Sequence, residues 1–240
     1  MIVLSKKRLL LITSMVLVSL FVFVFQTVRI DNNNSTVPTV ALPVSNKVIV
    51  LDAGHGIPDE GAQSSTGTTE AQTNLKIALK VQNLLEQSGA TVILTRSDEN
   101  AIYDLDSKTL KEKKISDIHN RVKIGNENSA DIFVSIHLNK IPQNQYWGWQ
   151  CFYKDGNEQS TKLAKSLQSN LNESIQKENK RVAMKLDTVY IMKHVEVPIS
   201  IVECGFLSNP EEEKLLLEDS YQDKLAWGIY NGIIDYFYQN

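Results

Sequence analysis

From residue 47 onward, short apolar runs alternate with longer amphipathic segments. Residues 48–51 (VIVL) form a continuous apolar run, which predicts a strand buried on both faces. Over residues 70–87 apolar side chains recur at helical spacing, and Ser88-Gly89 then provides a helix stop. Residues 91–95 (TVILT) predict the next strand. This order predicts a first β-α-β unit.

The same alternation continues to the end of the chain. We predict helices near residues 115–126, 158–178 and 210–240, and strands at residues 131–136, 147–153, 188–192 and 199–202. Alternating strands and helices of this kind indicate an α/β fold, in which helices cover both faces of a single sheet.

The first thirty residues have a different pattern. Lys6-Lys7-Arg8 precedes an apolar run that is close to the roughly 20 residues needed to span a bilayer. We expect residues 1–30 to be an uncleaved membrane anchor, with a cleaved signal peptide as the alternative. Either segment would place the remainder of the chain outside the cytoplasm. Residues 31–46 are polar and aperiodic, which predicts a linker before a single domain over residues 47–240.

The charge balance excludes one class of partner. Four of the 25 Lys and Arg residues lie in the first thirty residues, which leaves 21 basic against 28 acidic residues and a net charge of -7 in the remainder. Nucleic-acid binding requires a basic stripe, and none follows residue 30. Hydrophobic residues at 42% and charged residues at 22% are ordinary values for a globular domain.

Four chemically active side chains stand where such a sheet binds ligands, which is beyond the carboxyl ends of its strands. His55 follows the first predicted strand, and His137 ends the third. Glu203 ends the strand at residues 199–202. Glu70 opens the first helix, which should begin near the same edge because the preceding strand ends there. We therefore expect the four groups to converge on one rim.

Two histidines and one carboxylate form a known catalytic zinc set that leaves a fourth position for water. A second carboxylate is then needed to take the proton of that water, and Glu203 is the candidate because Glu70 can serve as a ligand. Plainer interpretations exist: a polar loop residue for His55, a hydrogen-bonded core histidine for His137, or a first-turn acid that complements the helix dipole for Glu70. The competing histidines are His119 and His194.

The two cysteines, Cys151 and Cys204, lie far apart in the sequence and outside any C-x-x-C spacing. We predict two thiols buried in neighbouring strands, with a disulfide as the alternative. Neither spacing suggests a thiolate zinc site.

Five motifs, in order, resemble those of the N-acetylmuramoyl-L-alanine amidases of the Amidase_3 type. They are residues 50–56 (VLDAGHG), Glu70 with Asn74-Leu75, Arg121, residues 131–139 (DIFVSIHLN) and residues 201–209 (IVECGFLSN). The resemblance extends over residues 47–238. Residues 56–62 (GIPDEGA) depart from the more usual Gly-Gly-x-Asp-Pro-Gly-Ala form, beside the expected metal site.

The resemblance implies one zinc ion per chain, held by His55, Glu70 and His137, with Glu203 as the catalytic carboxylate. It implies peptidoglycan as the substrate, cut between the lactyl group of N-acetylmuramic acid and the first L-alanine of the stem peptide. It also implies a mixed six-stranded sheet with helices on both faces. The small size and N-terminal segment are similar to the sporulation members of the family, which prepare muramic-δ-lactam formation in the spore cortex. An accessory regulatory protein is a further hypothesis.

Two other functions stay open from the sequence. The first is a zinc peptidase that cuts within the stem peptide, and its reaction products would distinguish it from an amidase. The second is a wall-binding scaffold with no catalytic activity, and a metal-free domain that bound glycan would favour it.

Overall fold

The computed structural model describes residues 6–31 and 42–239. The chain divides into two compact units, Met1–Val40 and Ala41–Asn240. Most of the predicted linker lies outside the described residues, but its last part is packed, since Val44 is fully buried in the core of the second unit. The folded unit therefore begins a few residues before the predicted boundary at Lys47.

The first unit contains helix α1 (Lys6–Asp31). Its described apolar side chains, such as Leu10 and Phe21, are exposed. Among the residues that the structure describes, no helix meets the length and apolarity needed to cross a membrane. The membrane anchor over residues 1–30 stays a prediction.

The second unit is built on a mixed six-stranded sheet, as predicted. The strands are β1 (Val48–Ala53), β2 (Thr91–Leu94), β3 (Ile132–Asn139), β4 (Gln150–Tyr153), β5 (Met184–Lys185) and β6 (Ile199–Phe206). Their order is β2-β1-β3-β6-β4-β5. Strands β2, β1, β3 and β6 are parallel, whereas β4 runs antiparallel to β6. The carboxyl ends of β1, β3 and β6 consequently share one rim, at which β4 begins.

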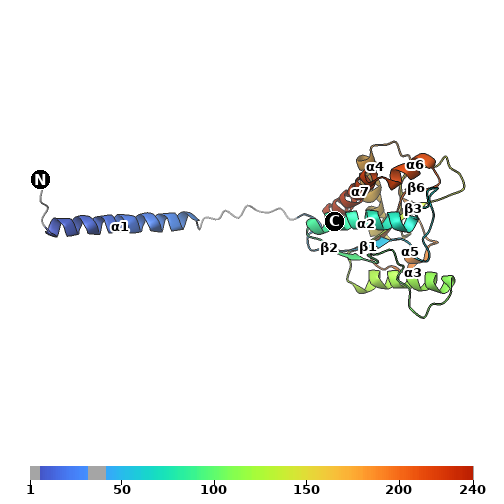
Figure 1. The fold of residues 1–240 in the computed structure, drawn as a ribbon, viewed down its shortest axis with the longest axis horizontal. Coiled ribbons are helices and arrows are strands. Elements are labelled where there is room, and N and C mark those ends of the chain that lie inside the picture. The colour runs from blue at the N-terminus through green and yellow to red at the C-terminus, as the bar shows by residue number, and fades with distance from the viewer. Residues whose placement is uncertain (1–5, 32–41, 240) are drawn as a thin grey trace. The chain divides into compact units, whose positions relative to one another are not determined.

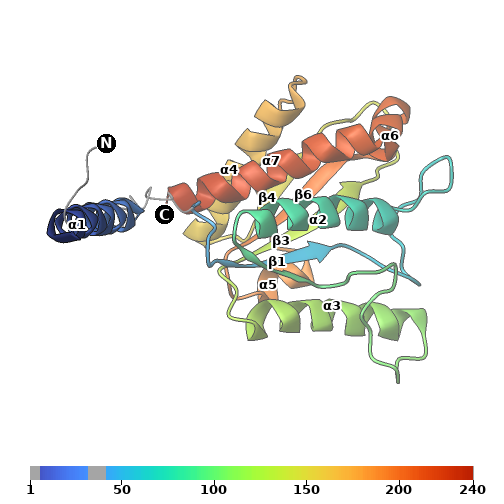
Figure 2. The same ribbon diagram turned by 60° about the vertical axis from the view of Figure 1, so that its left-hand side comes forward.

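Helices cover both faces of this sheet (Figure 1). They are α2 (Glu70–Gln87), α3 (Leu110–Glu127), α4 (Glu158–Ile175), α5 (Tyr190–His194), α6 (Pro210–Leu217) and α7 (Asp219–Tyr238). Figure 2 shows α3 below β1, with α2 and α7 on the opposite side. Side chains from α2, α4 and α7 form the larger apolar cluster against the sheet, and those from α3 and α5 form the smaller one.

The structure differs from the sequence-based prediction at residues 188–192, which were predicted as a strand. Tyr190–His194 instead form the short helix α5, and Ile191 and Met192 bury their side chains in the smaller apolar cluster. The sheet is completed by β5 a few residues earlier, at Met184–Lys185. A short apolar run has no distinctive periodicity, so packing decided between helix and strand.

Two helix boundaries also differ from the predictions. Helix α3 begins at Leu110 because Thr109 and Glu112 form a capping box ahead of the apolar positions. The helical region from Pro210 onward is two helices, since Glu218 has extended backbone between α6 and α7.

The two cysteines form no disulfide with each other. Cys151 and Cys204 are free, buried thiols, which confirms the prediction of two buried thiols.

Candidate active site

The structure brings His55, Glu70 and His137 together at the carboxyl rim. One ligand atom from each of the three lies within 4.8 Å of the others. Glu70 Oε1 is 3.0 Å from His137 Nδ1 and 3.4 Å from His55 Nε2. The two imidazole rings lie edge to face, with centroids 5.0 Å apart. This arrangement of two nitrogens and one carboxylate oxygen could hold a divalent cation.

Glu70 is the first residue of α2, and its carboxylate is buried and fully hydrogen-bonded. The Thr69 side chain caps α2 and thereby makes Glu70 the first residue of the helix. The backbone N–H of Ala62 donates to Glu70 Oε2 and that of Leu138 donates to Oε1. Although burial disfavours the charged form, hydrogen bonds from His137 and His55 hold the pKa of Glu70 far below its usual value. Glu70 is therefore deprotonated, as a carboxyl group must be to bind a metal ion.

His55 lies on a strained stretch of backbone immediately after β1. Its φ is +62°, a conformation that non-glycine residues adopt only where the surroundings impose it. Arg121 provides that restraint, because its Nη2 donates to the His55 carbonyl oxygen at 2.6 Å and its Nη1 donates to that of Ala53 at 2.8 Å. Arg121 is itself buried and paired with Asp52 and Asp117.

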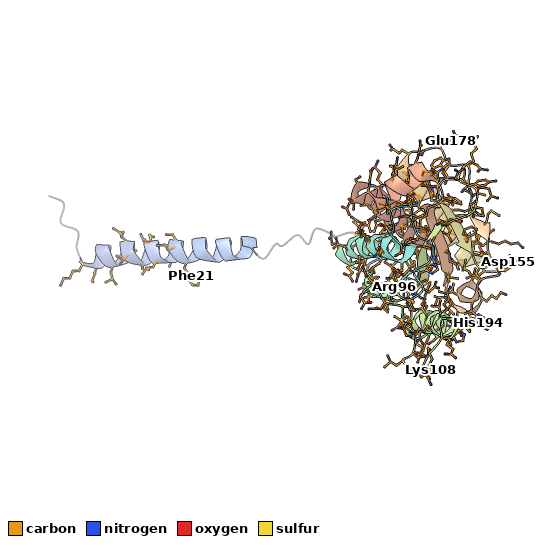
Figure 3. The ribbon with its side chains drawn as sticks, turned by 45° about the vertical axis from the view of Figure 1, so that its right-hand side comes forward. Phe21, Arg96, Lys108, Asp155, Glu178 and His194 are labelled. Atoms are coloured by element: carbon orange, nitrogen blue, oxygen red, sulfur yellow. The ribbon has the colours of Figure 1, made fainter. Side chains whose placement is uncertain are left out.

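Arg96 completes this support and was not among the predicted site residues. Its guanidinium donates to the carbonyl oxygens of Ala53, Gly54 and Ala71, and it is 3% exposed. Figure 3 labels Arg96 within the folded unit. The Asn74 amide also donates to the Gly54 oxygen, so Asn74 supports the loop rather than a ligand side chain. Buried carbonyl groups need donors, and in this turn the donors come from other segments.

Two glycines fit closely around the three side chains. A Cβ atom on Gly54 would lie 2.2 Å from His137 Cε1, and one on Gly61 would lie 2.5 Å from Glu70 Oε2. Any larger residue at either position would displace a member of the group. The backbone is thus shaped around the His55, Glu70 and His137 side chains, and their donor set matches the ligands of catalytic zinc.

Glu203 lies beside this group but in a different environment. It sits within β6, directly opposite His137 on β3, rather than beyond the strand end as predicted. Its Oε2 is buried and has no hydrogen-bond partner in the described part of the chain. Burial, reinforced by the negative charge of Glu70, raises the pKa of Glu203 to about 7. Such a carboxyl group can both accept and release a proton near neutral pH.

A cavity of about 310 Å³ opens over these residues. His55, His137 and Glu203 line one side, and side chains from α3 and α5, including Lys114 and Ile191, line the other. Lys114 pairs with Asp59 at 3.0 Å, and Asp59 lies 3.6 Å from His55 Nδ1. The proton-accepting group and the possible cation site therefore face the same space, as hydrolysis by an activated water requires.

Comparison with known proteins agrees with this geometry. Residues 49–235 match the family Amidase_3, described as N-acetylmuramoyl-L-alanine amidase. The chain belongs to this family. The germination-specific N-acetylmuramoyl-L-alanine amidase of Bacillus subtilis is 38% identical to this amidase over 221 residues, covering 92% of this chain and 91% of that protein.

Two solved structures share the fold of this amidase. The CwlD amidase from Clostridioides difficile, solved in complex with the GerS lipoprotein, is 42% identical, with a TM-score of 0.79. The alignment covers 81% of this chain and 100% of that one. The catalytic domain of CwlV from Bacillus (Paenibacillus) polymyxa var. colistinus is 30% identical, with a TM-score of 0.68, covering 79% and 97% respectively.

The remaining predicted site residues of this amidase lie elsewhere. His119 and His194 pack against the Tyr190 ring, with ring centroids 4.8 Å and 3.8 Å away, and neither lines the cavity over Glu203. Asn139, the last residue of the motif at residues 131–139, lies at the end of β3, where its backbone oxygen accepts from the Leu207 N–H. The competing histidines are therefore not part of the candidate metal centre.

Proposed function

We propose that this amidase uses zinc to cleave the amide bond between the lactyl group of N-acetylmuramic acid and the L-alanine of the stem peptide. The observation that carries the proposal is the convergence of His55, Glu70 and His137 within 4.8 Å. Two imidazoles and one carboxylate suit zinc, and the fourth tetrahedral position is left for water or substrate. The family match over residues 49–235 supports the choice of bond.

Zinc bound by these residues would lower the pKa of a water molecule from about 15.7 towards 7 and polarise the lactyl carbonyl group. The Glu203 carboxylate accepts a proton from the attacking water, whose oxygen bonds to the carbonyl carbon. Glu203 then returns the proton to the amide nitrogen as the carbon–nitrogen bond breaks. The products are a lactyl carboxylate and the free amine of L-alanine. In the metal-free chain, burial raises the pKa of Glu203 to about 7.

Mass spectrometry of peptidoglycan fragments treated with the zinc-loaded full-length chain tests this proposal. The expected products are glycan with intact, peptide-free muramic acid and peptides that begin with a free L-alanine amine. Cuts within the stem peptide would instead identify a zinc peptidase. A protein that contained no metal after zinc loading, yet bound glycan, would identify a scaffold.

We place the activity outside the cytoplasm, in the formation of the spore cortex, where peptide removal precedes muramic-δ-lactam formation. This role is supported by the likeness to a germination-specific amidase of Bacillus subtilis. Deletion of the gene should abolish muramic-δ-lactam in purified spores, and complementation by the Glu203→Ala variant should not restore it. Normal lactam content in the deletion strain would contradict the role.

An accessory protein is also part of the proposal. It is supported by the CwlD amidase from Clostridioides difficile, which was solved in complex with the GerS lipoprotein. Crosslinking in sporulating cells, followed by purification of the amidase, should recover a specific envelope protein. If the purified amidase alone matched the zinc affinity and turnover of the complex, an activating role for that protein would be wrong.

A further inference from the structure

A second cavity lies on the same rim, on the far side of Glu203 from the candidate metal centre. It has a volume of about 640 Å³ and is lined by residues of two segments, 145–147 and 177–181. The first segment lies between β3 and β4, and the second follows α4 and precedes β5. The first segment reaches the rim because β4 starts there, running antiparallel to β6. The second reaches it because β5 is parallel to β4 and starts at the same edge. Figure 3 shows Glu178 at the edge of the unit.

Arg181 links this cavity to the active site. Its Nη1 donates to Gln150 Oε1 at 3.2 Å, and Gln150 on β4 stands directly opposite Glu203 on β6. Residues paired in this way point to the same face of a sheet, on strands about 4.8 Å apart. The Arg181 guanidinium therefore lies roughly 8 Å from the Glu203 carboxyl group, taking one strand spacing and one hydrogen bond together.

The surroundings hold the Arg181 guanidinium in place yet leave donors free. It lies over the Phe206 ring at 4.6 Å and near the Tyr146 ring at 5.9 Å, and its Nε donates to the Trp147 carbonyl oxygen. Its Nη2 donates no hydrogen bond within the described residues, and no described carboxylate lies within 4.0 Å of it. A planar, oriented guanidinium with a free edge is suited to bind a carboxylate.

The other charges in this region leave a positive balance. Lys177 lies over the Trp147 ring at 4.0 Å, and Lys180 pairs with Glu178 at 3.4 Å. The nearby Glu212 carboxylate accepts from the backbone N–H groups of Gly148 and Phe206, and it also attracts Lys177 and Arg181 electrostatically. Three cations, Lys177, Lys180 and Arg181, therefore face two anions, Glu178 and Glu212, which leaves a net positive charge here on a domain that is net negative.

We propose that Arg181 binds a free carboxylate of the stem peptide, on its second residue, and so selects acidic peptides for cleavage. This inference rests on the proposed function. An extended peptide advances about 3.4 Å per residue, so a carboxylate two to three residues from the scissile carbonyl lies roughly 7–10 Å from it, a range that includes the reach of Arg181 from Glu203. N-acetylated sugars are neutral and would gain little from a guanidinium. The peptide side of the substrate therefore fits this cavity better than the glycan side.

Two substrates that differ in one group test the assignment. Peptidoglycan fragments of equal glycan length would carry either L-alanyl-D-glutamate or L-alanyl-D-isoglutamine, in which a carboxamide replaces the carboxylate. For the zinc-loaded full-length chain we expect kcat/KM to be at least about 10-fold higher on the acid, because only the carboxylate can form a hydrogen bond between two charged groups with the guanidinium. Arg181→Gln should remove this preference by lowering kcat/KM on the acid alone, and Arg181→Lys should retain part of it.

Lys162→Gln is the matched control, because it removes one positive charge from the exposed face of α4, where Lys162 has its one ion pair within the described part of the chain, with Glu158. It should leave the preference unchanged. Equal rates of the unmodified chain on both substrates, or an equal loss on both with Arg181→Gln, would overturn the inference. If neither substrate is cleaved, the proposed function fails. Calorimetric binding of both fragments to the Glu203→Gln chain then tests Arg181 separately, and equal affinities would reject it.

Discussion

The N-terminus of α2 and the middle of β6 each bury a glutamate on the same rim, in opposite electrostatic environments. Glu70 accepts hydrogen bonds from two backbone N–H groups and lies against two imidazoles, so its pKa is held far below the usual value. Glu203 has one carboxylate oxygen with no hydrogen-bond partner among residues 6–31 and 42–239, and burial raises its pKa to about 7. Paired carboxyl groups whose pKa values are pushed apart divide their roles. Glu70 is suited to hold a cation, and Glu203 to move protons.

Charged side chains are also buried at this rim of the sheet. Beyond Glu70, the buried polar side chains of α2, α4 and α7 are uncharged, and they include Thr73, Gln168 and Gln222. At the rim, by contrast, Asp52, Arg96 and Arg121 are all buried, and each is paired or hydrogen-bonded to backbone oxygens. Buried charges are costly unless compensated, and here the compensation holds the His55 turn in place.

The largest effect should follow replacement of Glu203. Glu203→Gln removes the group that accepts the proton but keeps its size, so we expect turnover to fall by about 10³-fold or more. Zinc content should stay at one ion per chain, because Glu203 is not among the three ligand residues. Product release and elemental analysis of the same preparation measure both quantities. Full activity in this variant would remove Glu203 from the mechanism.

Glu70→Gln should weaken zinc binding, in contrast to Glu203→Gln, which should retain zinc. The amide oxygen can still accept a hydrogen bond from Leu138 or Ala62, but the negative charge that balances a cation is gone. We expect zinc affinity to fall by at least about 100-fold, and the lost turnover to return as zinc is added. Competition with a chromophoric chelator measures the affinity. If Glu70→Gln and the unmodified chain bound zinc with equal affinity, the role of Glu70 as the anionic metal ligand would be wrong.

The pH dependence of stability should distinguish the two carboxyl groups in the chelated, metal-free chain. The folded pKa of Glu203 lies above its ordinary value of 4.5, so the folded state binds the extra proton and stability declines as pH rises from 4.5 to about 7. The decline should be at most about 3 kcal/mol. Glu70 acts in the opposite sense, because its lowered pKa means that stability is lost only below pH 4.5.

Urea denaturation of the metal-free chain across pH 4.5–8 measures this dependence. The Glu203→Gln variant should show a smaller decline over that range and be the more stable protein at pH 8. A decline of the same size in the variant would mean that other groups, such as His137, cause it.

The smallest expected effect concerns the backbone around Glu70. Gly61→Ala would place a Cβ atom 2.5 Å from Glu70 Oε2, and we expect about a 10-fold loss of zinc affinity as the carboxylate shifts. Gly156→Ala is the control, since Gly156 has nearly the same φ, +72° against +71°, but nothing within 4 Å. Both variants bear similar backbone strain, of about 1 kcal/mol in unfolding free energy. Equal zinc affinities would show that the close fit at Gly61 is not needed.

Local pattern was sufficient for much of the fold and for proposing which side chains meet at the candidate site. The apolar run at β1 and the helical spacing of α2 depend on neighbours in sequence, and α2 spans the predicted residues 70–87. The turn after β1 and the first residue of α2 were expected at the same edge of the sheet, because a helix that follows a strand in an α/β unit begins near the carboxyl end of that strand. His55, Glu70 and His137 could therefore be named before their distances were known.

Only the tertiary structure decided how that site is supported. Arg96 and Asn74 reach the Gly54 carbonyl oxygen from other segments, and no local periodicity carries that information. The strand expected at residues 188–192 is a helix because Ile191 and Met192 pack under α3, which a short apolar run does not reveal. The elevated pKa of Glu203 likewise depends on its burial and on the charge of Glu70, a residue more than a hundred positions away. Spacing along the chain determines which groups can meet, but the energy of a buried charge is set by whatever surrounds it in space.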